Sequence, residues 1–154
     1  MKKLLSAVLV CLVAVSLMGC GASTKTVKGT VVKATIPDDW SLVDGKKMNG
    51  AGGADYICDS KEYKAGDPYL NISESSKSIS DLKALLKDGT LYGKYYGDVK
   101  LDNGTWYLAK NAAVAKVNKK TFIVTGYKCD FNSDEVQDIL GSLKWVKASK
   151  VVVK

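Results

Sequence analysis

The sequence predicts an α+β fold, a mainly antiparallel β-sheet with two packed helices that together form an α-β-α sandwich. Two stretches repeat apolar residues at helical spacing, one in the middle of the chain and one near its end. Short β-branched runs separated by turn residues fill most of the remainder. Each helix must bury one apolar stripe, and a meandering sheet offers faces for both. The expected order is three strands, a helix, three or four strands and a helix.

Three strands are expected in the first half of the folded region. Residues 30–36 are rich in β-branched side chains, and the run ends at Pro37, which cannot continue a strand ladder. Residues 54–61 and 69–75 alternate weakly in polarity and are separated by a loop that ends at Pro68. These two runs are therefore expected to pair.

The first helix carries both start and stop signals. Ser78 stands at the N-cap position with Asp81 three residues later, and Gly89 follows where a left-handed C-terminal residue belongs. Its apolar stripe consists of Ile79, Leu82, Leu85 and Leu86. We expect about three turns with one buried face.

The second half predicts two hairpins and a closing helix. Asn103 and Gly104 separate two apolar runs, which is a strong hairpin signal. A second hairpin is expected between residues 114–117 and 121–127. The last helix is expected to begin near Asn132, and its buried stripe consists of Val136, Ile139, Leu140 and Leu143.

The chain begins with a segment typical of export rather than of a folded element. Lys2 and Lys3 precede a nearly unbroken apolar run over residues 4–18. This run is shorter than the roughly 20 residues that a transmembrane helix needs. It ends at residues 17–20, Leu-Met-Gly-Cys.

This ending resembles the lipobox of bacterial lipoproteins, whose cysteine is acylated and becomes the first residue. The resemblance implies a signal peptide over residues 1–19, a lipid such as palmitate on Cys20, and a place on the outer side of a bacterial cell membrane. Small and polar residues then predict a lipidated tether over 20–29, one domain over 30–146, and a tail over 147–154 that either forms a short strand or frays. The alternative is a cleaved signal in which the cysteine is incidental.

The charge and composition of the chain limit the kinds of partner that it is expected to bind. All 23 basic residues are lysines, against 16 acids, and histidine is absent. Without the signal segment the excess is about +5, spread mostly one or two lysines at a time among aspartates. This pattern favours a solvated surface with no nucleic-acid partner, and weak, salt-screened attraction to an envelope polyanion or a protein partner. No cofactor motif is present.

Two cysteines remain in the exported chain besides Cys20. Cys58 and Cys129 lie 71 positions apart, which fits no zinc or redox motif. In an oxidising compartment the first interpretation is a disulfide between them, and two free buried thiols are the alternative.

The aromatic and glycine-rich stretch over residues 91–97 is the candidate ligand-contact region. Tyrosine combines a large apolar body with a hydroxyl, so Tyr92, Tyr95 and Tyr96, together with Trp106, are candidate ligand contacts. The alternative is that this stretch simply packs a loop onto a sheet edge.

No catalytic or metal-binding motif stands out. Residues 130–134 begin like a calcium-binding loop, but Glu135 stands where a glycine is required and Gly141 where a glutamate is required. Ser80 and Lys83 are three apart, yet they lie at a helix start where capping explains them. Two function classes stay open: a binding or assembly module, or an envelope hydrolase that uses aspartates or a Ser-Lys pair.

Short structural motifs are similar to those of the PsbP/Mog1/DcrB-like family. They are the proline and tryptophan turn at residues 36–40, the central helix, the antiparallel hairpins and the terminal segment over residues 139–145. The resemblance implies an α-β-α sandwich that serves as a binding or assembly module rather than as an enzyme.

Overall fold

The computed structural model describes residues 23–48 and 53–146. In chain order its elements are β1 (Thr24–Lys28), β2 (Val32–Pro37), β3 (Ser41–Asp44), the 3₁₀ helix η1 (Gly45–Met48), β4 (Ala54–Cys58), β5 (Tyr69–Ser75), α1 (Ile79–Asp88), β6 (Tyr95–Leu101), β7 (Gly104–Ala109), β8 (Ala112–Val117), β9 (Lys120–Tyr127), α2 (Asp134–Ser142) and β10 (Lys144–Trp145). Seven strands form one antiparallel sheet in the order β3-β4-β5-β9-β8-β7-β6, and three form a smaller sheet in the order β1-β2-β10.

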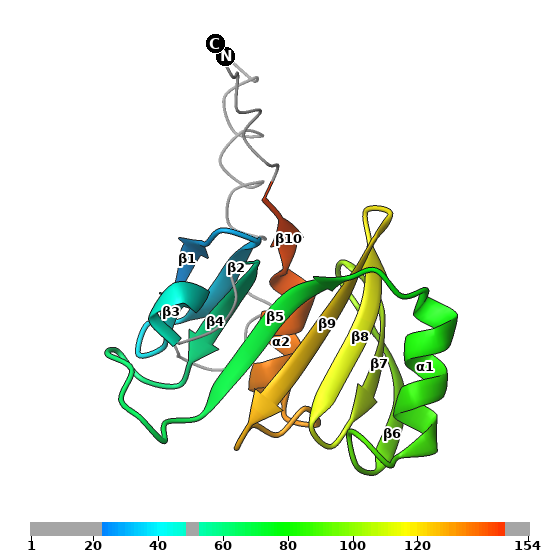
Figure 1. Ribbon diagram of the computed structural model, residues 1–154. Helices are drawn as coiled ribbons and strands as arrows, with labels where there is room; N and C mark the ends of the chain where they lie inside the picture. The colour runs from blue at the N-terminus through cyan, green and yellow to red at the C-terminus, as the bar shows by residue number, and fades with distance from the viewer. Residues whose placement is uncertain (1–22, 49–52, 147–154) are drawn as a thin grey trace, which may run out of the picture.

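The two helices lie on opposite faces of the larger sheet (Figure 1). α1 packs against β6, β7 and β8, and its residues Leu82 and Leu86 are buried against the sheet. α2 and the smaller sheet cover the other face, where the main core contains Trp106, Phe122 and Ile139. The predicted α+β sandwich is therefore confirmed.

The helix termini follow their local signals. Ser78 Oγ accepts a hydrogen bond from the Asp81 amide at 3.1 Å, and Gly89 adopts a φ of 75°. The N-cap of α2 is Ser133, whose Oγ accepts from the Val136 amide at 3.3 Å, and the helix begins at Asp134, two residues after the expected start near Asn132. Each N-cap serine thus accepts a hydrogen bond from a backbone amide in the first turn of its helix, which would otherwise lack a partner.

Both predicted hairpins are present. Gly104 has a φ of 142° at the turn between β6 and β7, a conformation that favours glycine. Asn118 and Lys119 have φ values of 50° and 69° between β8 and β9. Two left-handed residues in a two-residue loop match the twist of the flanking strands.

The tether expected over residues 20–29 is too long. Residues Thr24–Lys28 form β1 and pair with β2, so only Gly21, Ala22 and Ser23 separate Cys20 from the sheet. The polar composition misled the prediction because β1 is an edge strand whose outward residues are lysine and threonine, and Val27 packs on the core. The short strands β3 and β10 were not predicted either.

A buried carboxylate joins the two sheets. Asp55 of β4 is fully buried; its Oδ1 accepts from the Thr30 amide at 3.0 Å, and its Oδ2 accepts from the amides of Val31 and Val32 at 2.6 and 2.8 Å. A Cβ on Gly29 would collide with this carboxylate, which explains the glycine there. The turn between β1 and β2 is thereby fixed to the larger sheet.

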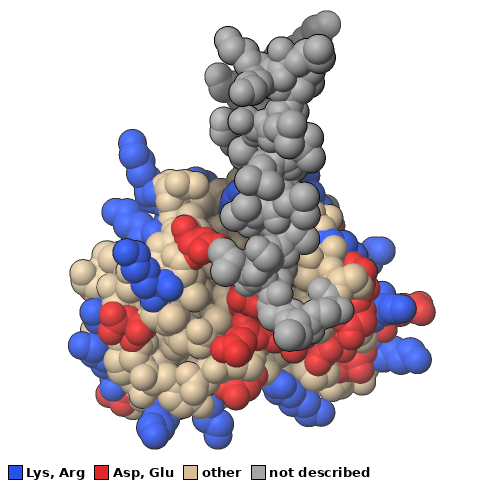
Figure 2. All heavy atoms as spheres, turned by 180° about the vertical axis from the view of Figure 1, so that it is seen from behind, with Lys and Arg blue, Asp and Glu red and all other residues tan. Residues whose placement is uncertain are grey.

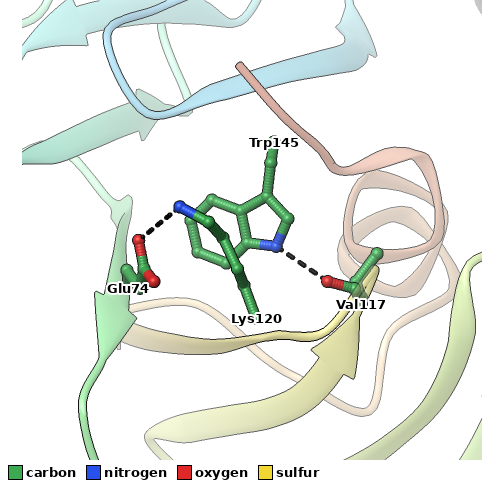
Figure 3. A network of polar contacts seen from close by, with 4 residues as sticks. All are labelled: Glu74, Val117, Lys120 and Trp145. Atoms are coloured by element: carbon green, nitrogen blue, oxygen red, sulfur yellow. Dashed lines mark hydrogen bonds and ion pairs between the residues drawn. The ribbon is translucent and has the colours of Figure 1, made fainter. Parts of the chain in front are cut away.

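Trp145 of β10 closes the core beside the β8–β9 turn (Figure 3). Its indole stacks on Phe122 with ring centroids 3.6 Å apart, and its Nε1 donates to the Val117 carbonyl at 2.9 Å. Lys120 Nζ lies 5.4 Å from the indole centroid and 2.9 Å from Glu74 Oε2. The stacking on Phe122, the hydrogen bond to Val117 and the Lys120–Glu74 ion pair beside the indole thus hold the smaller sheet to the larger one at this end.

Candidate functional site

The four aromatic residues predicted to contact a ligand do not form one surface. Trp106 is fully buried in the main core, and its Nε1 donates to Asn103 Oδ1 at 2.8 Å, so its assignment as a ligand contact was wrong. Tyr92 and Tyr95 pack on the opposite face of the sheet, under α1. Tyr96 remains 39% exposed. Successive residues of a strand point to opposite faces of the sheet. Residues that are close in the sequence can therefore lie on different faces, as these aromatic residues do.

A second tyrosine cluster lies on the face that carries α1, but beyond the reach of that helix. It consists of Tyr56, Tyr63, Tyr69 and Tyr127, which come from β4, the β4–β5 loop, β5 and β9. The ring of Tyr69 is central: its centroid lies 5.4 Å from that of Tyr56, 6.4 Å from Tyr63 and 5.5 Å from Tyr127. Burial raises the pKa of the Tyr69 hydroxyl, so the group stays protonated and can donate a hydrogen bond.

The strand register explains why these tyrosines lie together. Cys58 of β4 lies opposite Tyr69 of β5, which lies opposite Tyr127 of β9. In Figure 1, β5 and β9 are left open on the side where α1 covers β7 and β8. The sequence offered no signal for the cluster, because its members are separated by up to 71 positions and only the sheet register brings them together.

A shallow hollow of about 370 Å³ adjoins the cluster at the edge strand β3. Its lining residues are Ser41, Leu42, Val43, Asp44, Lys47, Lys61, Glu62 and Tyr63. Tyr63 belongs to both features, so the tyrosine cluster and the hollow are continuous. Ser41 Oγ is buried and has no hydrogen-bond partner among the described residues. The hollow therefore offers lysine donors, carboxylate acceptors, one free hydroxyl and an aromatic wall.

Among the described residues, no serine at the hollow is hydrogen-bonded to a lysine. A serine nucleophile needs a base within hydrogen-bond reach. Lys47 and Lys61 line the same hollow as Ser41, yet neither bonds to its Oγ. The other Ser-Lys pair considered, Ser80 and Lys83, is also unsuited, because Lys83 Nζ lies 4.1 Å above the centre of the Tyr107 ring.

No metal centre is found within residues 23–48 and 53–146: they contain no group of three or more cysteine, aspartate or glutamate side chains placed to hold an ion. Asp130, in the segment that begins like a calcium loop, instead shapes the turn before α2. Its Oδ1 accepts from the Asn132 amide at 2.9 Å, and its carbonyl accepts from Ser133 Oγ at 2.8 Å.

Acidic side chains gather on the face that carries α2 (Figure 2). Burial raises the pKa of Asp138, and the charge of Asp134 raises it further. The pKa of Asp59 is also raised, first by burial and then by the negative charge of Asp39. The negative charge is therefore concentrated on part of the face that Figure 2 shows.

Cys58 and Cys129 are free thiols in the structure, and they lie near each other in space. Burial and then Asp67 raise the pKa of Cys58 to about 11. Burial, Asp59 and Cys58 itself raise the pKa of Cys129 to about 12. Since the thiolate is the reactive form, both groups react slowly at neutral pH. The disulfide between them stays a prediction.

We expect peptide mapping of the exported protein to recover Cys58 and Cys129 in one disulfide-linked peptide pair. The bond would close a loop of about 70 residues and add roughly 4 kcal/mol to the free energy of unfolding in the chain-entropy model. Alkylation must follow denaturation, because the raised pKa values slow labelling of the folded protein. Recovery of both residues as alkylated thiols from oxidised material would contradict the prediction.

The lipid-attachment residue Cys20 and the tail over 147–154 lie outside the described residues. No helix in the described part of the chain is long and apolar enough to cross a membrane. No family model, curated protein or solved structure matches this sequence.

Proposed function

We propose that the chain is a lipid-anchored extracytoplasmic protein of the bacterial cell envelope whose single domain acts as a binding or assembly module. The lipobox-like segment ending at Cys20 supports the anchor and the location. The resemblance to PsbP/Mog1/DcrB-like domains supports a module that binds rather than catalyses. A fold alone does not determine function, so the surface of the domain must provide the support for binding.

The hollow beside β3 is the proposed ligand site, and the observation that carries it is the free Ser41 hydroxyl at its wall. A buried hydroxyl without a partner is costly, and a ligand group that bonds to Ser41 Oγ would remove that cost. Lys61 and Glu62 add charges of both signs, and Tyr63 adds an aromatic face. This combination fits a neutral or zwitterionic polar chain, such as a peptide or sugar segment of the cell wall, better than a polyanion.

The alternative is an envelope hydrolase working through Ser41 and a lysine. It would require a lysine Nζ within about 3 Å of Ser41 Oγ. The absence of a hydrogen bond from Ser41 Oγ among the described residues favours binding over this alternative. The same site thus serves to test both proposals.

We expect soluble cell-wall peptide and glycan fragments to perturb the NMR signals of residues 41–44 and 61–63. Tyr63→Ala should weaken binding by about tenfold, the cost of losing one buried aromatic contact at an interface. Tyr96→Ala is the control, since Tyr96 is a surface tyrosine of β6, at the other edge of the sheet. Equal losses in both variants would contradict the assignment, and cleavage of the fragments that depends on Ser41 would establish the hydrolase.

A further inference from the structure

The short connection to Cys20 fixes which end of the domain faces the membrane. Thr24 is the first residue of β1, so four Cα–Cα steps separate it from Cys20. At the extended limit of about 3.6 Å per residue these steps span roughly 14 Å. This argument rests on the lipid anchor proposed above. Whatever surrounds Thr24 must then lie close to the lipid headgroups.

The start of β1 lies at the same end of the sheet as Tyr127. Thr24 pairs with Pro37, and the Asp38 amide donates to the Ser23 carbonyl at 3.1 Å. β3 begins shortly afterwards at Ser41. Ser41 is the first of four residues that lie side by side on four neighbouring strands. These four residues are Ser41, Cys58, Tyr69 and Tyr127.

The exposed large apolar side chains of the described residues gather at this end. They are Leu91, Tyr127 and Tyr96, with exposed fractions of 65%, 42% and 39%. Backbone hydrogen bonds connect them. The Asn111 amide donates to the carbonyl of Tyr92, next to Leu91, and the Gly126 amide donates to the Asn111 carbonyl, next to Tyr127.

Exposed lysines accompany these side chains. Lys94 and Lys110 are joined by a backbone hydrogen bond of 2.9 Å beside Tyr96, and Lys128 Nζ lies 5.1 Å from the ring centre of Tyr127. Tyrosine favours the boundary between water and hydrocarbon, and lysine can lay its aliphatic stem along an apolar surface while its ammonium group stays in water. We name the set Leu91, Lys94, Tyr96, Lys110, Tyr127 and Lys128 the membrane end.

We propose that the membrane end rests on the headgroup layer of the bilayer that holds the lipid on Cys20. Leu91 is 65% exposed, and a domain held within roughly 14 Å of a bilayer can bury this side chain at the interface. Asp39 and Asp59 lie close to each other at the same end of the domain as the start of β1. Their negative charges offset the lysines, so this end of the domain is not strongly cationic. Contact therefore depends on the apolar and tyrosine side chains rather than on anionic lipid.

The test couples the mature chain through Cys20 to a maleimide lipid in phosphatidylcholine vesicles. Coupling at neutral pH selects Cys20, because burial raises the pKa values of Cys58 and Cys129 to about 11 and 12. The reference is the same chain coupled to a soluble maleimide. We expect amide hydrogen exchange over residues 89–97 and 126–128 to slow on the vesicles and to stay slow in high salt. Residues 117–120, at the other end of β9, should exchange at the same rate in both samples.

The variant Leu91→Ser/Tyr96→Ser should lose this protection on vesicles, whereas Lys119→Ser, in the distant turn, should keep it. Equal exchange on vesicles and on the soluble carrier, or protection of residues 117–120 instead, would overturn the proposal. Protection that requires anionic lipid and vanishes in salt would also overturn it. Because the lipid is attached chemically, these outcomes do not depend on whether cells acylate Cys20.

Discussion

Replacing Cys20 with serine is expected to abolish membrane anchoring. Serine has no thiol to accept the lipid, so the chain should accumulate as an uncleaved precursor or appear in the soluble fraction. Each buried methylene of an acyl chain contributes about 0.8 kcal/mol to membrane binding, and stable anchoring takes two chains or an equivalent second signal. The contacts proposed for the membrane end are few, so they should not retain the protein without the lipid.

The measurement is fractionation combined with the mass of the amino-terminal peptide. The unaltered protein should require detergent rather than salt for extraction, and its first peptide should begin at an acylated Cys20. Lys119→Ser is the control, because this variant changes an exposed residue of the β8–β9 turn and leaves the lipobox-like segment intact. An unchanged lipid-bearing amino terminus in the Cys20→Ser protein would remove the basis for the proposed location.

Local signals explain why much of the fold was predictable from the sequence. The N-cap Ser78, the C-terminal Gly89 and the turn residue Gly104 act through backbone groups within a few positions, so they need no tertiary partner to be recognised. Amphipathic stripes predicted both helices because periodicity reports which face is buried. These elements are sufficient to specify the fold class.

The errors occurred where structure depends on distant partners. β1 has a single core residue, Val27, and exists because β2 provides a ladder for it. Trp106 was predicted to contact a ligand because its sequence neighbourhood does not reveal that its side chain is buried in the main core. The hollow beside β3 combines an edge strand with residues 61–63, about twenty positions away. Register and tertiary approach create these features, and neither is written in local composition.

Asp55 shows the same dependence on distant partners, and its loss should have the largest effect on stability. In the sequence it is one polar residue in a weakly alternating strand, but in the structure its carboxylate accepts three backbone amide bonds from residues 30–32. Asp55→Ala would leave three amides without their acceptor. Each buried, unsatisfied donor costs about 1–3 kcal/mol, and partial relaxation toward water makes a total near 4 kcal/mol reasonable. That is a large part of the 5–15 kcal/mol typical of a domain.

Chemical denaturation of the Asp55→Ala and Asp55→Asn proteins measures this effect. Asparagine keeps one acceptor oxygen, which can still serve Val31 and Val32 from the Oδ2 position, while its amide group faces the Thr30 N–H. The loss in Asp55→Asn should therefore be intermediate. Asp98→Ala, at an exposed position of the edge strand β6, should change the free energy of unfolding by no more than about 0.5 kcal/mol.

Gly29→Ala provides an independent route to the same contact. Its new Cβ would push against the Asp55 carboxylate without removing the acceptor, so Gly29→Ala should also be destabilised. Combining it with Asp55→Ala should cost less than the sum of the two single changes, since the alanine at position 55 leaves room for the added methyl group. Full additivity of the two changes, or an Asp55→Ala protein as stable as Asp98→Ala, would show that the carboxylate does not hold the two sheets together.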